Sequence, residues 1–435
     1  MTDNWNPLEL AKKSKTFCIF PWIHQYVGPP GDVKPCCVYD YSSELGSLKE
    51  NTLQEIWNNE KTKQMRLQFL KGEMNEGCTL CNSRVELNDQ FYKLFNEKFF
   101  DENENIQSIV ASTQQDGFVE EHKLFYIDVR FNNLCNLKCR MCSPHYSTSW
   151  FSDHKKLYDL KHAKETNNSS YRYAGKTETQ ALEEIIPHLP HAEIIYFAGG
   201  EPLLQKEHYE VLNKLIELNK FDMEIRYNTN FNNLKIKDYP NVLEYWKKFN
   251  NVIVNASLDA TDERAEFWRS GTNWKNIIEN RKMLAKECPN VTFNITLTLS
   301  WVNAYNLVSF HKEWVNLGYV FPENLIINPL DTPPYYCLKN IPLWKKQKIE
   351  ELFLNHIKWL ETQNCHKSIY RYKTIIEFMY SDVSAKPIDE SLKMFSRITK
   401  KLDSIRGESF FDVFTEHKDL QEYIIENNLD DEFHY

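Results

Sequence analysis

The sequence predicts an α/β fold in which parallel strands alternate with helices, with a small cysteine-rich segment before them and a helical region after them. Three observations predict this arrangement. Apolar, β-rich runs alternate with helix-patterned segments through the middle of the chain, polar clusters follow the ends of these runs, and roughly the last hundred residues have helical periodicity.

Six apolar runs in the middle of the chain are expected to be strands, because each is short and rich in β-branched and aromatic residues. Helix-like segments separate them, which favours parallel strands with the helices outside. Six strands are too few for a closed eight-stranded barrel, so a partial barrel and an open doubly wound sheet both remain. The runs begin at Leu124, Glu193, Met223, Asn251, Val291 and Leu325.

Polar clusters follow the first four of these runs. In both candidate architectures the carboxyl ends of parallel strands meet at one edge, where function is located. We therefore expect the four clusters to meet at one mouth. They are a cysteine triplet at 135–142, Gly199–Pro202, Asn228–Asn230 and Ser257–Asp259.

The chain is expected to divide into four parts. The polar, acidic stretch that starts at Asp101 is typical of a linker and separates two groups of cysteines. Near the other end, an apolar stripe (Ile349, Leu352, Phe353, Ile357 and Leu360) predicts helices that pack on the strand–helix core. The predicted boundaries are 1–104 for the cysteine-rich domain, 105–122 for the linker, 123–335 for the strand–helix domain and 336–435 for the helical region.

Composition narrows the environment and the partners. The net charge of −9 does not indicate the basic surface that binds a polyanion, so nucleic acid is an unlikely partner. No apolar stretch approaches the roughly 20 residues that span a bilayer, and the N-terminus lacks the apolar region of a secretion signal. We expect a cytoplasmic protein without a membrane partner, in which the eleven cysteines are reduced and suit metal ligation better than disulfides.

The triplet Cys135, Cys139 and Cys142 places three thiols within eight residues. Thiolates suit zinc or iron–sulfur clusters. A cubane cluster normally has four cysteine ligands, so three would leave one iron open to a small molecule. The alternative is a zinc knuckle whose fourth ligand is distant in sequence.

A glycine pair favours the iron–sulfur cluster with an open iron over the zinc knuckle. The chain has only 12 glycines, yet Gly199 and Gly200 are adjacent and precede Glu201 and Pro202 after a predicted strand. Glycines let the backbone approach a ligand closely, and a carboxylate beside them can hold an ammonium group.

Together, the triplet and the Gly199–Pro202 motif resemble the radical S-adenosylmethionine (SAM) superfamily. The resemblance implies a partial (β/α)6 TIM-like barrel over residues 123–335 and a SAM-binding [4Fe–4S] cluster on the triplet, with Gly199, Gly200, Glu201 and Pro202 contacting SAM. By position, Asn230, Ser257 and Arg269 resemble further SAM contacts. Met141 stands where the superfamily often has an aromatic residue.

The resemblance also implies a reaction. SAM would chelate the open iron, and reductive cleavage would give a 5′-deoxyadenosyl radical that takes a hydrogen atom from substrate. An electron donor such as flavodoxin or ferredoxin would be needed. Residues that act directly on the substrate are not identified by the sequence.

A second group of cysteines lies in the N-terminal domain. Cys18, Gly31 and Cys36 have the spacing Cys-x12-Gly-x4-Cys, and Cys78 and Cys81 form Cys-x2-Cys. Between them, the Thr52–Glu55 pair predicts a capping box at the start of a helix. Taken alone, a hairpin, a helix and a knuckle predict a zinc ribbon as readily as a cluster site.

Beside the first motif, this domain resembles the twitch domain, a short relative of the SPASM domain that carries an auxiliary [4Fe–4S] cluster. It departs from most members by lying before the barrel, and Cys37 could replace Cys36 as a ligand. The resemblance implies that Cys18, Cys36, Cys78 and Cys81 hold a fully ligated cluster that accepts an electron from the substrate.

The resemblance favours a peptide or protein as substrate, which would be oxidised or crosslinked. Two alternatives remain: a small-molecule alcohol or sugar dehydrogenase of the same superfamily, and a non-catalytic iron–sulfur or zinc-binding module. Cys337 follows the sixth predicted strand and could donate a hydrogen atom, although a structural, half-buried thiol is the simpler interpretation. Cys288 and Cys365 are expected to be structural, and His24 to be a surface or packing residue.

Overall fold

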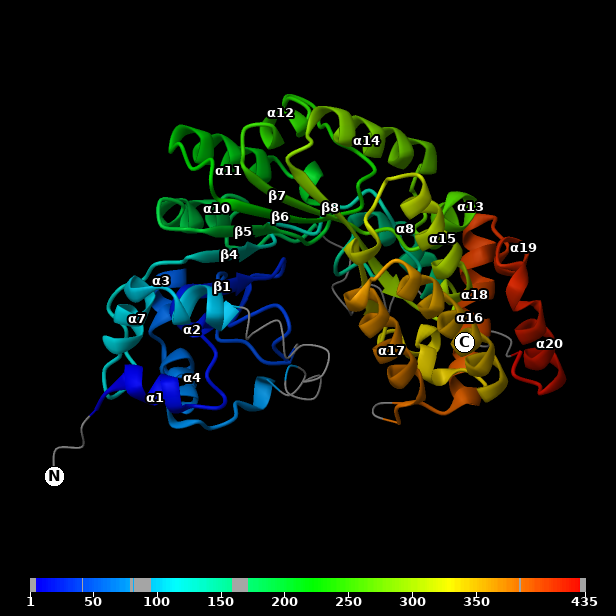
Figure 1. Cartoon of the computed structure of the whole chain (residues 1–435), viewed down its shortest axis with the longest axis horizontal. Coiled ribbons are helices and arrows are strands. Elements are labelled where there is room, and N and C mark those ends of the chain that lie inside the picture. Colours follow the sequence, from blue (N-terminus) through cyan, green and yellow to red (C-terminus); the bar gives the residue numbers. More distant parts are fainter. Residues whose placement is uncertain are drawn as a thin grey trace. The chain divides into compact units, whose positions relative to one another are not determined.

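The computed structural model describes residues 5–40, 42–78, 81, 95–158, 171–382 and 385–430. Helices and strands alternate along much of the chain (Figure 1). The chain divides into two compact units, each built from several segments. The first unit comprises Met1–Asn133, Arg172–Arg226 and Lys248–Val252; the second comprises Leu134–Tyr171, Tyr227–Lys247 and Ile253–Tyr435.

All six predicted strands are present, and the fold is α/β, as expected. The strands pair in sequence order within a nine-stranded sheet whose order is β3-β2-β1-β4-β5-β6-β7-β8-β9. The pairs β4–β5 and β8–β9 are parallel. The six strands are β4 (Tyr126–Val129), β5 (Ile194–Phe197), β6 (Glu224–Thr229), β7 (Asn251–Ala256), β8 (Val291–Leu299) and β9 (Leu325–Pro329).

Three short strands of the N-terminal segment belong to the same sheet. β2 (Asp32–Lys34) pairs antiparallel with β1 (His24–Val27) and with β3 (Gly46–Ser47), which is the expected hairpin. β1 also pairs in parallel with β4, so that His24 lies opposite Tyr126. All four residues of β1 are buried, because the strand is covered on both faces. The spacing of the cysteines does not predict that this hairpin continues the main sheet.

Three of the N-terminal helices, α1 (Pro7–Lys13), α3 (Leu53–Trp57) and α4 (Glu60–Lys71), begin with a side-chain cap. The predicted capping box is confirmed: Thr52 caps α3 and Glu55 returns to the Thr52 backbone. The chain from 101 to 117, expected to belong mainly to a linker, contains α7 (Glu104–Ala111), whose apolar side chains are buried. A further helix of this segment is α2 (Phe20–Ile23).

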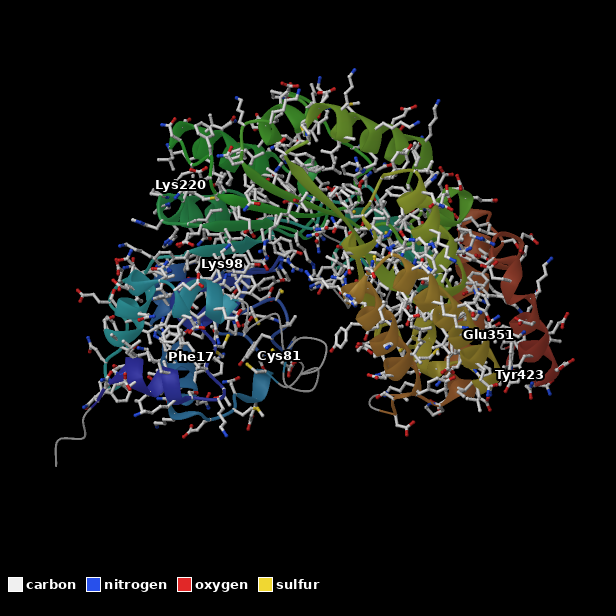
Figure 2. The ribbon with its side chains drawn as sticks, in the orientation of Figure 1. Phe17, Cys81, Lys98, Lys220, Glu351 and Tyr423 are labelled. Atoms are coloured by element: carbon white, nitrogen blue, oxygen red, sulfur yellow. The ribbon has the colours of Figure 1, made fainter. Side chains whose placement is uncertain are left out.

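A short π-helical turn, η2 (Glu97–Asp101), precedes α7 and contacts the sheet through a side chain. Its Phe99 and Phe100 are buried. Lys98, which is labelled in Figure 2, forms an ion pair of 3.0 Å with Glu224 of β6. The same carboxylate pairs with Arg226, so both of its oxygens have partners.

Helices follow the strands, as the alternation predicts. In the first unit, α11 (Lys206–Glu217) buries Val211, Leu212 and Leu215 on one face. The other helices between strands are α10 (Gln180–Ile185), α12 (Leu243–Trp246), α13 (Asp262–Trp268), α14 (Trp274–Glu287) and α15 (Ala304–Asn316).

The C-terminal region is helical, as predicted. The stripe of α16 (Leu343–Thr362) is confirmed for Ile349, Phe353, Ile357 and Leu360, which are buried. Leu402 packs with Trp150 and Leu157 in one apolar cluster, which joins α18 to α8. The other elements are α8 (Phe151–Leu157), α17 (His366–Tyr380), α18 (Ile388–Arg406), α19 (Phe410–Val413) and α20 (Lys418–Glu426).

Candidate metal centres and cofactor site

The cysteine loop (residues 135–142) belongs to the second unit and lies against the chain that follows α13. The amide of Lys138 donates to the carbonyl of Ser270 at 2.8 Å, and a second backbone bond follows two residues further on. Gly271, at φ +101°, makes this approach possible: a Cβ there would lie 2.8 Å from the carbonyl oxygen of Asn136. The loop is therefore held by backbone pairing on one side.

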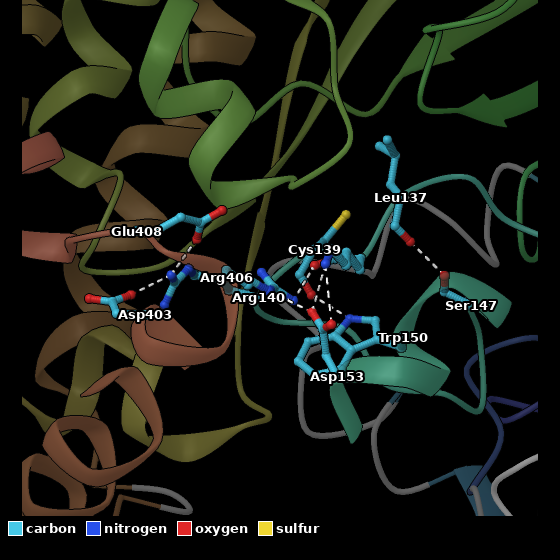
Figure 3. Close-up of polar contacts among 10 residues, drawn as sticks. Leu137, Cys139, Arg140, Ser147, Trp150, Asp153, Asp403, Arg406 and Glu408 are labelled. Carbon is cyan, nitrogen blue, oxygen red and sulfur yellow. Dashed lines mark hydrogen bonds and ion pairs between the residues drawn. The ribbon is translucent and has the colours of Figure 1, made fainter. Parts of the chain in front are cut away.

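Side chains from the following turn fix the carbonyl groups of the loop. The hydroxyl of Ser147 donates to the carbonyl of Leu137 at 2.5 Å, and the indole of Trp150 donates to that of Cys139 at 2.8 Å (Figure 3). These carbonyls have no partner within a regular element, and buried polar groups need one. The result is a tight, irregular loop whose thiols are presented by a fixed backbone.

Two arginines join the loop to the C-terminal region, one reaching out from the loop and the other reaching toward it from α18. We call these contacts the clasp. Arg140 of the loop donates from Nη2 to Asp403 at 2.5 Å and to Glu408 at 2.7 Å. Arg406 of α18 donates to Asp153 at 2.8 Å and to a backbone carbonyl of the loop at 2.9 Å (Figure 3). The side chains of Arg140 and Arg406 are almost fully enclosed. The helical region thus supports the loop directly as well as packing beside it.

Burial favours the neutral form of two thiols of the loop, Cys139 and Cys142. Burial raises the pKa of Cys139, and it raises that of Cys142 to about 12. Arg269 acts in the opposite direction on both: its Nη1 lies 3.9 Å from the sulfur of Cys139, and its Nε donates to Asp259 at 2.6 Å. A buried thiol beside a guanidinium is a ligand that a metal cation deprotonates on binding, so the donor set fits an iron–sulfur cluster.

The structure brings two of the three predicted SAM contacts of this unit to the cysteine loop. Asn230, which follows β6, donates to the side chain of Asn136 at 2.8 Å, and Arg269 contacts Cys139. Ser257 follows β7, is half-buried, and donates its amide to the carbonyl of Thr229. The roles of all three in SAM binding stay predictions.

The glycine motif lies in the first unit, directly after β5. Gly199 has φ +80° and Gly200 φ +54°, and a Cβ at Gly199 would lie 2.6 Å from the Cβ of Arg130. Glu201 is 1% exposed, and its Oε1 accepts from the amide of Leu203 at 3.1 Å. The turn therefore requires glycine and buries a carboxylate, as expected of a site for an ammonium group.

The four predicted ligands of the N-terminal domain gather around one another. Cys18 is influenced electrostatically by Cys78 and Cys81, and Cys36 by Cys18 and Cys78. Each of the four is half-buried, and burial raises the pKa of Cys78 to about 12. Half-buried thiols that lie close enough to influence one another are of the ligand type that iron–sulfur clusters use, and the ligand set itself stays a prediction.

One neighbour of these thiols is not evident from the sequence. Tyr39 lies beside Cys36 and Cys78, and burial raises its pKa to about 12. Its hydroxyl donates to Asn75 at 3.1 Å, and a Cβ at Gly77 would clash with its ring at 2.2 Å. The tyrosine and the glycine before Cys78 therefore fix the approach to this ligand.

Within the described ranges, no three His, Cys, Asp or Glu side chains are arranged so that they could hold a metal ion. The thiolates of a single zinc ion would have to lie about 2.3 Å from one point. The ligands of an iron–sulfur cluster bind different irons, so they do not have to converge on one point.

The remaining thiols and His24 are buried. Cys288, Cys337 and Cys365 are each less than 5% exposed, so Cys337 is more enclosed than the expected half-buried thiol. His24 is a packing residue whose Nδ1 lies 2.8 Å from the carbonyl of Tyr126. None of the helices in the described part of the chain has the length and apolarity needed to cross a bilayer.

Sequence reasoning missed the clasp. A signal was present in Arg140, a charge placed between two proposed ligands, where a strongly basic side chain has no ligand role. Its acceptors, Asp403 and Glu408, lie more than 260 residues away in the chain, and nothing in their local sequence distinguishes them from surface carboxylates.

Comparisons with known proteins match both cysteine-containing domains. A family model described as the radical SAM superfamily matches residues 129–301, and a SPASM model described as an iron–sulfur cluster-binding domain matches residues 18–82. No curated protein matches the chain.

Several solved structures are similar over part of the chain. One is described as native anSMEcpe with bound AdoMet and Cp18Cys peptide (18% identity, TM-score 0.35), and it covers 53% of this chain and 58% of that one. Another is SuiB of Streptococcus suis bound to S-adenosylmethionine (16% identity, TM-score 0.34), covering 66% of this chain and 60% of that one. The chain thus spans about three fifths of the length of these structures.

Proposed function

We propose that this chain, which belongs to the radical SAM superfamily and carries an iron–sulfur cluster-binding domain before its main α/β core, oxidises or crosslinks a peptide or protein substrate. Its cofactors are a SAM-binding iron–sulfur cluster, SAM and a second iron–sulfur cluster. When bound, these groups supply one-electron chemistry that removes a hydrogen atom from the substrate and takes up the electron that remains.

The observation that carries the proposal is the cysteine loop. Its three thiols are supported by backbone pairing, by side-chain bonds to its carbonyls and by the clasp. Such support on several sides is what a site needs to hold a reactive group in one position. In the proposal, Cys135, Cys139 and Cys142 are the three protein ligands of the first cluster.

The other residues of the site bind and orient. Glu201, buried beside two glycines, would accept hydrogen bonds from the amino group of SAM. Asn230 and Arg269 both contact the cysteine loop, and they would donate hydrogen bonds to oxygen atoms of SAM. Asp259 holds the guanidinium of Arg269 in place at 2.6 Å and so acts through it.

In the N-terminal domain, Cys18, Cys36, Cys78 and Cys81 would hold a second [4Fe–4S] cluster. Four thiols fill the coordination of a cubane, so the substrate would have no open iron there and the cluster would accept an electron. A peptide or protein substrate is proposed because the pairing of these two domains resembles peptide-modifying enzymes. Oxidation of a small alcohol or sugar is the alternative within the superfamily.

Anaerobic reconstitution with iron, sulfide, SAM and dithionite tests the enzymatic assignment. The wild-type chain is expected to release 5′-deoxyadenosine, and the variant with all three loop cysteines changed to Ala is expected to release none. If wild type and variant both fail while holding iron, the chain is a non-catalytic iron–sulfur module. A short open reading frame for a precursor peptide beside the gene would support the peptide substrate.

A further inference from the structure

Three side chains in the first unit lie in one row across adjacent strands. Tyr26 of β1 is in register with Asp128 of β4, and Asp128 is in register with Tyr196 of β5. Residues opposite one another in paired strands point to the same face of the sheet. Asp128 is therefore the centre of a polar row on that face.

The carboxylate of Asp128 has no hydrogen bond. The residue is 1% exposed, and neither oxygen accepts a bond from any group that the structure describes. A buried carboxylate can accept about four bonds and normally has several. Burial accordingly raises the pKa of Asp128 to about 6, against the opposing effect of Arg130. The protein buries this acceptor without supplying a donor for it.

Arg130 is the cation paired with Asp128, and by geometry the two form a long ion pair in place of a hydrogen bond. Its Nε lies 3.7 Å from the Asp128 carboxylate, beyond hydrogen-bond distance, and has no acceptor within the described chain. The guanidinium lies 4.8 Å from the centre of the Tyr26 ring, while the side chain remains 21% exposed. An unused acceptor thus faces an unused donor, and the arginine is the partly exposed member of the pair.

The pair lies between two segments that the proposed function uses. The stem of Arg130 packs against Gly199 of the SAM motif, where an added Cβ would meet it at 2.6 Å. Cys37, next to the proposed ligand Cys36, is close enough to feel the charges of both Asp128 and Arg130.

We propose that Asp128 and Arg130 form a substrate-binding site for a neutral group that both donates and accepts hydrogen bonds. This inference rests on the proposed function and assigns the substrate contacts that it lacks. Asp128 accepts from the donor of the bound group, and Arg130 donates to its acceptor.

The charges of the pair select for a neutral ligand. A cation would compete with Arg130 for the carboxylate, and an anion would face the carboxylate, so each charged ligand would meet a like charge. An apolar group would leave two buried polar atoms unsatisfied, which is costly. A carboxamide and a hydroxyl both combine a donor with an acceptor, and a single hydroxyl oxygen can reach two atoms 3.7 Å apart.

Ligand-observed NMR on the reconstituted full-length chain with SAM tests the site with four small probes: acetamide, ethylene glycol, acetate and methylammonium. The wild-type protein is expected to broaden the lines of acetamide or ethylene glycol, and Asp128→Leu to reduce this broadening several-fold. The two charged probes are expected to show no difference between the proteins. Stronger broadening by acetamide indicates an amide on the substrate, and stronger broadening by ethylene glycol indicates a hydroxyl.

Glu224→Gln is the matched control, because Glu224 lies on the same sheet but both of its oxygens already have basic partners. It should leave the probe lines as in wild type. If Asp128→Leu fails to fold, Asp128→Asn keeps the shape and should still weaken the broadening. The proposal is overturned if the neutral probes behave alike in all variants, or if a charged probe depends most on Asp128.

The failure of this inference can be separated from a failure of the proposed function. Release of 5′-deoxyadenosine without substrate tests the function, and probe binding tests the pair. Cleavage of SAM with no probe effect would reject the pair and leave the enzyme assignment standing. Probe binding without SAM cleavage would reject the proposed function and leave the pair standing as a binding site.

Discussion

Removing the two carboxylates of the clasp is expected to destabilise the chain strongly. Arg140 is fully enclosed, and its Nη2 is held by Asp403 and Glu408, while its Nε and Nη1 have no acceptor in the described chain. The double variant Asp403→Ala/Glu408→Ala leaves a buried cation without a carboxylate, which costs about 3–5 kcal/mol. Glu408→Ala alone should cost about 1.5–3 kcal/mol, the value of one hydrogen bond to a charged group.

Denaturant unfolding of the anaerobic, reconstituted chain, followed by tryptophan fluorescence, measures these losses. A typical domain has only about 5–15 kcal/mol of stability, so the double variant should lose a large share of its total. Iron should be lost first from the cysteine loop that carries Arg140. The N-terminal cluster should be retained.

A rescue variant makes the reasoning refutable. Adding Arg140→Met to the double variant removes the unpaired cation and keeps most of the side-chain volume, so it should restore most of the lost stability. The explanation fails if the double variant loses less than about 1 kcal/mol, or if the triple variant is no more stable than the double. Either result would mean that water or another group already satisfies Arg140.

Three further perturbations are expected to separate the parts of the molecule. Chemical analysis should find about eight irons per chain, and changing either the three loop cysteines or the Cys78–Cys81 pair should remove about half; zinc in place of iron in the N-terminal domain would contradict the second cluster. Gly199→Val should abolish SAM binding in equilibrium dialysis, since its Cβ would clash at 2.6 Å, whereas Gly318→Ala, whose Cβ meets nothing within 4 Å, should bind as wild type does. Burial lowers the pKa of His356 to about 3, below the roughly 6.5 of an unfolded chain, so its contribution to stability is complete above pH 6.5 and is lost as pH falls toward 3. Unfolding at pH 5.5 should show a loss of about 1.4 kcal/mol from this residue, and His356→Gln should have a correspondingly shallower pH dependence.

The strands and the helix starts could be predicted because local sequence determines them. The six runs alternate with amphipathic segments, and the Thr52 cap returns to the chain within three residues. Turn chemistry has the same property: Gly199 adopts a positive φ that favours glycine. At each of these positions the physical cause lies within a few residues of the effect.

The clasp and the polar row could not be predicted because their partners come together only in the folded chain. Arg140 meets Asp403, and Asp128 meets Tyr26, through tertiary packing. The polar stretch from Asp101 was expected to be mainly a linker, although its local sequence contains the pattern of a helix. Its composition is typical of a linker, yet Ile106, Ile109 and Val110 lie on one face of α7 and are buried.

The pairing of β1 with β4 affects the order in which the chain can be completed during synthesis. His24 lies opposite Tyr126, about a hundred residues later in the sequence. At about 5–20 residues per second, the ribosome needs about 5–20 s to supply that partner. Until then, one edge of β1 is unpaired, and the hairpin beside Cys36 lacks its support. We expect the N-terminal cysteines to reach their final arrangement only after β4 has emerged, so that this cofactor site cannot mature as soon as its own cysteines have been synthesised.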